Sequence, residues 1–165
     1  MAISSVAKNL RDGSITLSDG TGTPITITVQ YENGDFSISG LRQGTTDVNK
    51  YLDRGVFFSA RKVNQTFPTF SFSSILTDLS DASEKCLVDA CLKTGAFASG
   101  VSTLGANADV WAIKTVFTIE GTDHGDTGDH VLRLNDCVIT DVGISEGDPD
   151  NFSISGEVLG SITMS

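Results

Sequence analysis

The sequence contains no apolar run long enough for a signal peptide or a membrane-spanning helix. We therefore expect the chain to be made and folded in a cytoplasm, without a membrane partner. Basic residues are also scarce, because 11 Lys and Arg stand against 21 Asp and Glu, for a formal net charge of −10. A polyanion is bound through Lys and Arg that displace its counterions, so this balance disfavours nucleic-acid binding through phosphate contacts. It is compatible with a surface past which nucleic acid slides without being held.

Catalytic motifs are missing as well. The chain has no glycine-rich phosphate loop and no Gly-x-Ser-x-Gly nucleophile motif, and neither histidine has an evident Ser or Cys partner. Residues 123–130 combine Asp and His, which are metal-ligand types, but their spacing matches no calcium loop and suits a turn between strands. We expect no enzymatic activity and no cofactor, and we favour the turn over a metal site in this segment.

The three cysteines cannot all pair within one chain. Cys86 and Cys91 lie five residues apart in a predicted helix, where their side chains diverge too far for a disulfide. The favoured interpretation is three reduced, mostly buried thiols. The alternative is a disulfide between Cys137 and a cysteine of a neighbouring subunit.

Length and composition favour a single β domain. A chain of 165 residues suffices for one core, and its charged fraction is only 19%, so Ser, Thr, Gly and Asn must cover much of the surface. Apolar residues alternate at every second position in residues 25–31, 113–119 and 152–158, which is typical of half-buried strands. We expect an antiparallel β-sandwich or half-barrel over residues 1–165, with residues 1–13 as an extended N-terminal arm.

Two local patterns add detail to this expectation. Asn33-Gly34 is a strong two-residue turn and predicts a hairpin that joins residues 25–31 to residues 36–40. A capping-box pattern from Asp81 to Glu84 and apolar residues at helical spacing predict one flanking helix over about residues 81–94. The C-terminal third is predicted as a meander, with separate strands at residues 131–134 and 137–142.

The segment of residues 41–55 shows no periodicity and predicts a long loop between the second and third main strands. From residue 41 to residue 63, five basic residues stand against two acidic ones, whereas residues 120–150 hold nine acidic residues and one basic residue. A basic, partly apolar loop on an acidic body suits docking on another copy of the chain. The alternative is a loop that folds back on its own sheet and buries Tyr51 and Leu52.

These features together resemble the tail tube (major tail) proteins of long-tailed bacteriophages from Ser14 onward. The residues that carry the resemblance are Arg54-Gly55-Val56-Phe57, Phe67 to Phe72, the single mid-chain helix, Leu134 to Asp141 and Phe152 to Gly156. The resemblance implies that six copies form a ring through a shared inner β-barrel, and that rings stack into a hollow tube that conducts viral DNA during ejection. The inner tubes of contractile injection and type VI secretion systems share this fold and are the first alternative. A carbohydrate-binding or adhesive β-sandwich is the second.

The resemblance also implies partners and sites. The partners would be further copies of the chain and the tail terminator, tape measure and baseplate or distal tail proteins, and DNA would pass without specific binding. The protein would be part of the virion tail. The long loop would contact the next ring through Leu41, Arg42, Val48, Lys50, Tyr51, Leu52 and Arg54. The acidic side chains that we expect to face the lumen are Glu120, Asp136, Asp141 and Glu157.

Overall fold

The computed structural model of the chain describes residues 13–29, 36–41, 47–119 and 128–165. The expected N-terminal arm lies outside these ranges except for Gly13. The fold is mainly β and antiparallel, as predicted. Its strands are β1 (Gly13–Ser18), β2 (Thr26–Thr28), β3 (Ser37–Ser39), β4 (Asp47–Asp53), β5 (Val56–Asn64), β6 (Thr69–Ile75), β7 (Ile113–Ile119), β8 (His130–Ser145), β9 (Asn151–Val158) and β10 (Ile162–Met164).

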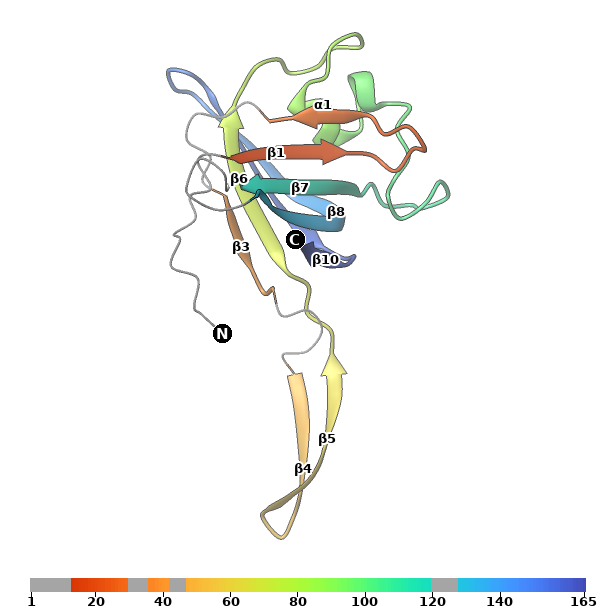
Figure 1. Ribbon diagram of the computed structural model, residues 1–165, viewed down its shortest axis with the longest axis vertical. Helices are drawn as coiled ribbons and strands as arrows, with labels where there is room; N and C mark the ends of the chain where they lie inside the picture. The colour runs from red at the N-terminus through yellow and green to blue at the C-terminus, as the bar shows by residue number, and fades with distance from the viewer. Residues whose placement is uncertain (1–12, 30–35, 42–46, 120–127) are drawn as a thin grey trace.

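An eight-stranded sheet with the order β2-β1-β7-β8-β9-β6-β3 forms the body, and β10 pairs with β8. The long strand β8 pairs with β7 through its first half and with β9 through its second half, and Cys137 pairs on both sides. Strand β8 therefore carries the sheet from one layer into the other. In Figure 1, β1 and β7 run across β6 and β3. Within the described residues the sheet ends at β2 and β3, so it is not closed into a barrel.

The core lies between these two layers. Strand β7 buries every second residue, Ile113, Thr115 and Phe117, as the sequence alternation predicted. The Phe117 ring meets the edge of Phe72 from the other layer, with 6.3 Å between the ring centroids. Such aromatic contacts stabilise a core beyond the area that they bury. The other large, fully buried side chains include Phe70, Phe97, Phe152, Leu17, Leu134, Ile154 and Val158.

The predicted helix is present but much shorter than residues 81–94. Helix α1 spans Leu87–Leu92 and ends at Lys93, which has a left-handed conformation, and a 3-10 turn, η2 (Gly95–Phe97), follows. The Asp81 carboxylate does accept hydrogen bonds from the amides of Ser83 and Glu84, which is one half of a capping box, whereas the Asp81 amide donates to Asp89. These bonds close a turn ahead of the helix rather than its first turn.

Two further strand predictions differ from the structure. Strands β2 and β3 do not pair with each other, because β2 pairs with β1 and β3 pairs with β6 at the opposite edge of the sheet. The two separate strands expected at residues 131–134 and 137–142 are one continuous strand, β8. The bend in β8 lies at Asp136, which has φ 53°.

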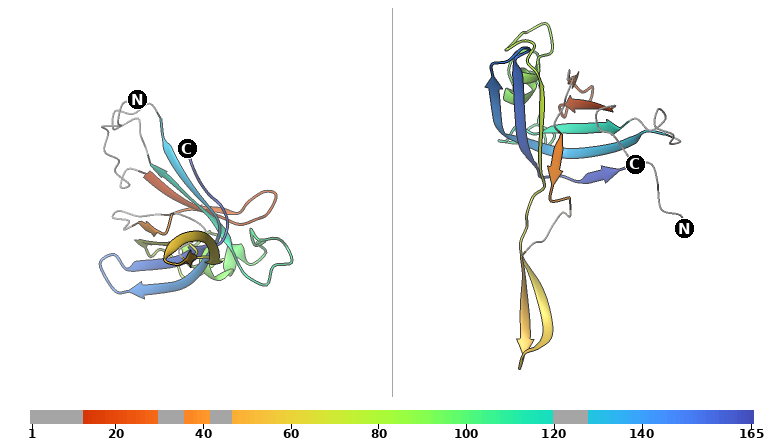
Figure 2. Two further views of the ribbon diagram at one scale, coloured as in Figure 1. Left: turned by 90° about the horizontal axis from the view of Figure 1, so that it is seen from below. Right: turned by 90° about the vertical axis from the view of Figure 1, so that its left-hand side faces the viewer.

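The predicted loop of residues 41–55 is largely a β-hairpin. Strand β4 pairs with β5 in a separate two-stranded sheet, so that residues 47–64 form a ribbon, which we call the hairpin. Figures 1 and 2 show the hairpin extending away from the body along the long axis of the molecule. None of the large apolar side chains described in it is packed in the core cluster.

Candidate functional site

The hairpin is turned by two residues, Arg54 and Gly55, between the paired residues Asp53 and Val56. Both turn residues have positive φ, 49° for Arg54 and 84° for Gly55. Positive φ at both central residues defines the type I′ turn that fits the twist of a β-ribbon, and Asn-Gly is its preferred sequence. Arginine has no such preference, since its Cβ makes the left-handed region unfavourable by about 1 kcal/mol or more. The turn therefore places a cation at the tip at some conformational cost.

Large apolar side chains cover the end of the hairpin. The exposed fractions are 77% for Phe58, 70% for Val56, 62% for Phe57, 61% for Leu52 and 47% for Tyr51. Leu52 pairs directly with Phe57, so these two side chains share one face of the ribbon. Phe58 lies at a register shift and has no direct partner in β4. Large exposed apolar side chains gathered at one end of an element in this way indicate an interaction site in soluble proteins.

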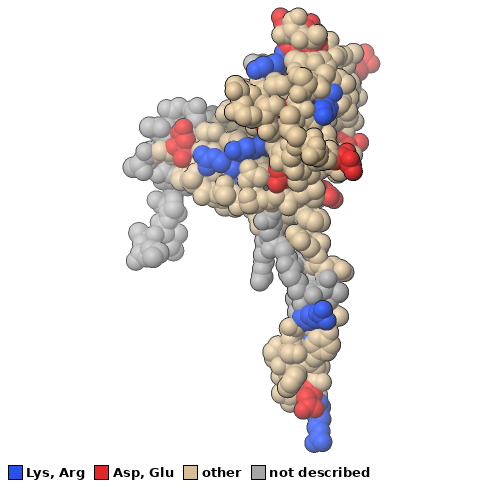
Figure 3. Space-filling view, turned by 90° about the vertical axis from the view of Figure 1, so that its right-hand side faces the viewer, with Lys and Arg blue, Asp and Glu red and all other residues tan. Residues whose placement is uncertain are grey.

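The charge on the hairpin is mainly positive. Among its described side chains, Lys50, Arg54 and Arg61 are basic and exposed, and Asp53 is acidic. Figure 3 shows basic side chains along the ribbon and at its tip, with one acidic group near the tip, while the body carries both acidic and basic side chains. The charge asymmetry predicted from the sequence is thus a property of two separate parts of the molecule.

The predicted inter-ring residues fall mostly on this hairpin. Lys50, Tyr51 and Leu52 lie in β4 and Arg54 lies in the turn. Val48 also lies in β4, but its side chain is outside the described part, as is the whole of Arg42. Leu41 is exposed and lies two residues after the end of β3, outside the hairpin as defined.

Val56, Phe57 and Phe58 follow the predicted loop and are not among the contact residues expected from the sequence. A signal was available in their spacing. Successive side chains of a strand point to opposite faces, so three adjacent large apolar residues cannot all enter one core. Gly55 was the matching signal for the turn, because glycine adopts positive φ without strain.

The second surface is a polar face of the body. Strands β6 and β9 bury one set of alternate residues and present the other set outward, and β3 continues the outward set at the edge of the sheet. We call the outward set the hydroxyl face; it comprises Ser37, Ser39, Thr69, Ser71, Ser73, Ser153 and Ser155. Hydroxyl pairs link β3 to β6, at 2.8 Å between Ser37 and Ser71 and 2.7 Å between Ser39 and Thr69.

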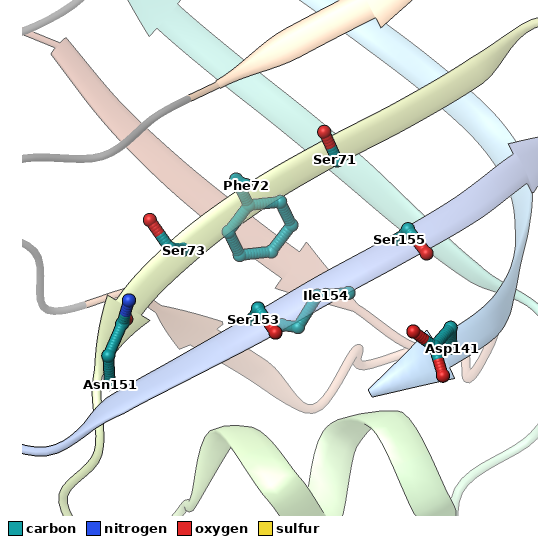
Figure 4. Close-up of a pocket in the computed structure, with 8 residues that line it drawn as sticks. All are labelled: Ser71, Phe72, Ser73, Asp141, Asn151, Ser153, Ile154 and Ser155. Atoms are coloured by element: carbon teal, nitrogen blue, oxygen red, sulfur yellow. The ribbon is translucent and has the colours of Figure 1, made fainter. Parts of the chain in front are cut away.

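A shallow pocket of about 370 Å³ lies on the hydroxyl face. Figure 4 shows its serines along β6 and β9, with Asp141 beyond them on β8. Asp141 pairs with Ser155, and Glu157 pairs with Thr69 and Val138, so these two predicted lumenal carboxylates share the face. Asp136 lies apart from them at the bend of β8, and Glu120 is outside the described residues.

A buried carboxylate fixes the segment that connects β6 to α1. Asp89 is fully buried and accepts hydrogen bonds from Thr94 Oγ1 at 2.6 Å, Ser80 Oγ at 2.8 Å and the Asp81 amide at 3.0 Å. Burial alone would raise the pKa of Asp89, but these hydrogen bonds outweigh it and hold the pKa below its ordinary value. A Cβ on Gly95 would overlap the carboxylate, so glycine is required there.

All three cysteines are free and buried, as the favoured interpretation predicted. Burial raises the pKa of Cys91 to about 12. Burial likewise raises the pKa of Cys137 to about 11, and its thiol donates to the Leu134 carbonyl at 3.4 Å. Thiols of this kind are unreactive near neutral pH, because the thiolate is the nucleophile. A disulfide from Cys137 to another subunit is therefore incompatible with this fold, since the side chain is inaccessible.

Two kinds of site are not found in the described residues. They contain no group of three or more His, Cys, Asp or Glu side chains close enough to hold a metal ion. Most of the segment 123–130 lies outside the described part, and only its last three residues are covered. No helix that the structure describes is both long and apolar enough to span a membrane.

No protein-family model and no curated protein sequence matches the chain. Solved structures match it over nearly its full length. A chain of the sheath–tube complex of an extracellular contractile injection system aligns with a TM-score of 0.57 and 11% identity, over 96% of this chain and 91% of its own. The tube-terminating cap of the anti-feeding prophage aligns with a TM-score of 0.59 and 12% identity, over 100% of this chain and 94% of its own.

A chain of the baseplate of the anti-feeding prophage also matches, with a TM-score of 0.52, 9% identity, and coverage of 99% of this chain and 97% of its own. These identities establish the architecture and not the activity. The matching structures are components of tubes, caps and baseplates. The chain therefore has a tail-tube-like fold.

Proposed function

We propose that this protein is the structural subunit of a tail-type tube, in which hexameric rings stack into a hollow cylinder. The observation that carries the proposal is the hairpin, whose exposed aromatic and aliphatic side chains have no partner in the core cluster of the described chain. Leaving such side chains in water is unfavourable by about 25 cal/mol for each Å² of apolar surface. A second copy of the chain would remove that surface from water.

The two sheet edges support ring formation. Strand β2 ends the described sheet on one side and β3 ends it on the other. An open edge presents unpaired N–H and C=O groups, and closure with neighbouring copies satisfies them. On this proposal the whole chain, residues 1–165, is one domain without enzymatic activity, and six copies close an inner β-barrel.

The hydroxyl face is the surface that we assign to the lumen. It is flat, polar and mostly neutral, with Asp141 and Glu157 as its described carboxylates. Hydroxyl groups exchange hydrogen bonds with water readily, and carboxylates repel a polyanion within about 10 Å at moderate salt. Such a wall would let DNA pass without binding it.

Two types of particle contain such a tube, and they differ in what the tube carries. A phage tail would conduct DNA and would place the chain in the virion, beside terminator, tape measure and baseplate or distal tail proteins. The matching structures favour a second candidate, the inner tube of a contractile injection system, because they belong to such particles. Both candidates require the same ring and the same stacking.

Electron microscopy of the purified protein at high concentration tests the proposal. We expect rings or tubes. A matched variant in which a tight turn replaces residues 47–64 should keep its melting transition and lose the tubes. Wild-type protein that stays monomeric and binds glycans would support the adhesive β-sandwich instead.

A further inference from the structure

A groove lies at the opposite end of the molecule from the hairpin tip. Strand β6 runs from Thr69, near the base of the hairpin, to Ile75, which lines the groove (Figure 1). The groove has a volume of about 250 Å³, with apolar walls that include Ile27, Val29 and Leu87. The hairpin and the groove are therefore separated along the long axis.

The rim of the groove is acidic. Asp78 and Glu84 line it and are exposed, and Lys85 is the basic residue among its lining residues. The Cys86 thiol in the same lining is raised in pKa, first by burial and then by the negative charges of Asp89, Asp78 and Asp81. Two carboxylates thus stand against one lysine in the lining of the groove, a formal charge of 1 − 2 = −1.

The hairpin tip has the complementary properties. Phe57 and Phe58 supply the apolar surface that the groove walls can cover. Arg54 lies next to Asp53 at the tip, and Lys50 and Arg61 further along make the described side chains of the hairpin positive on balance. The arginine occupies a turn position for which asparagine is the better residue. A charged residue that occupies such a turn position at a conformational cost is a candidate for a binding role.

Two other pockets fit the tip less well. The pocket on the hydroxyl face is lined mainly by serines and offers Phe72 and Ile154 as its apolar residues. The pocket beside Trp111 is smaller, at about 150 Å³, and pairs one cation, Lys93, with one anion, Asp109. Neither combines aliphatic walls with an excess of acid.

We propose that the hairpin tip of one copy docks in the groove of the next copy, with Phe57 and Phe58 against its apolar walls and Arg54 beside Asp78 and Glu84. The inference rests on the proposed tube function and names the acceptor surface of its stacking contact. The two surfaces differ and lie at opposite ends, so the contact is head to tail. After a head-to-tail pairing along one axis, each end of the stack still presents one unoccupied surface, so further copies can be added without limit.

Charge reversal on each surface tests the pairing. One variant carries Asp78→Lys and Glu84→Lys, a second carries Lys50→Glu, Arg54→Glu and Arg61→Glu, and a third combines all five changes. All five positions are exposed, so the fold should tolerate them. Sedimentation velocity and electron microscopy measure the fraction of protein in tubes. We expect at least a tenfold loss for each of the first two variants and recovery in the third.

Two controls separate docking from folding. Asp109→Lys places a similar charge change in a loop outside the groove and should stack like the wild type. Arg54→Asn removes the tip charge while improving the turn, so its tubes should be fewer although its circular dichroism is unchanged. If the Asp78→Lys/Glu84→Lys variant stacks at the wild-type level, the groove is not the acceptor surface, and the proposed tube function is unaffected. Loss in both reversal variants without recovery in the combined one would also overturn the pairing, and wild-type protein that forms no assembly would overturn both proposals.

Discussion

Replacing Asp89 by asparagine tests whether the buried carboxylate holds the wall of the groove. The substitution keeps the shape of the side chain and removes its charge. Oδ1 accepts the hydroxyls of Ser80 and Thr94, and Oδ2 accepts the Asp81 amide. If the asparagine keeps its oxygen toward the two hydroxyls, its NH₂ group faces the Asp81 amide, which is also a donor. A flipped asparagine leaves the two hydroxyls facing donors instead.

The magnitude follows from these contacts. A hydrogen bond to a charged group contributes about 1.5–3 kcal/mol, and a buried donor without an acceptor costs about 1–3 kcal/mol. Losing the charge on all three bonds and stranding one donor should therefore destabilise the fold by about 2–4 kcal/mol. For a domain of this size each kcal/mol lowers the melting temperature by about 2–4 °C, so we expect a decrease of roughly 5–15 °C.

Thermal unfolding followed by circular dichroism at pH 7 measures this effect, with the exposed Asp78→Asn as the control that should change stability by less than about 0.5 kcal/mol. The pH dependence gives a second test. Because the pKa of Asp89 is lowered from its ordinary value of 3.8, the stabilisation is complete above that pH and is lost as the pH falls through the folded pKa. The difference between wild type and variant should shrink in that acidic range. A variant that melts within 1 °C of the wild type at pH 7 would refute the reasoning.

The remaining predictions concern the helix, the thiols and the lumen. Leu87→Asp buries a charge without a partner and should cost several kcal/mol, enough to unfold the domain. Its control, Leu92→Asp on the exposed side of α1, should melt at the wild-type temperature. Equal melting temperatures for the two variants would mean that α1 does not pack on the sheet. The native protein should not react with a thiol reagent at pH 8, and all three cysteines should react after denaturation; rapid labelling of Cys137 in the native state would contradict its burial. Asp141→Lys with Glu157→Lys should leave tube assembly intact and slow DNA passage, measured as particles that adsorb but fail to eject; normal ejection would place the hydroxyl face outside the lumen.

The strands of the body could be predicted because each has one face in the core. Burial of Phe117 and Ile113 on one side of β7 produces the alternation that identifies a strand. The same holds for Phe152 and Ile154 in β9. The break between residues 134 and 137 misled the prediction, because the bend of β8 at Asp136 interrupts the alternation without ending the strand.

The hairpin could not be predicted in the same way, since neither of its faces meets the core of its own chain. Without a buried face there is no selection for period-two alternation, and residues 47–55 therefore look irregular. The helix was overextended for a related reason. The pattern at Asp81 is real, but Ser80 and the Asp81 amide are engaged by Asp89, so the backbone there closes a turn and the helix begins later at Leu87.

The course of β8 has a mechanical consequence. Its backbone is hydrogen-bonded to β7 and β10 in one layer and to β9 in the other, and Cys137 belongs to both ladders. Separating the two layers therefore requires more than breaking the side-chain contacts between them. It must also break the backbone hydrogen bonds that hold β8 to its neighbouring strands. A load applied to the β9 side is passed through covalent bonds to the β7 side. The body should yield as one stiff element, and deformation under axial force should concentrate where the hairpin joins it.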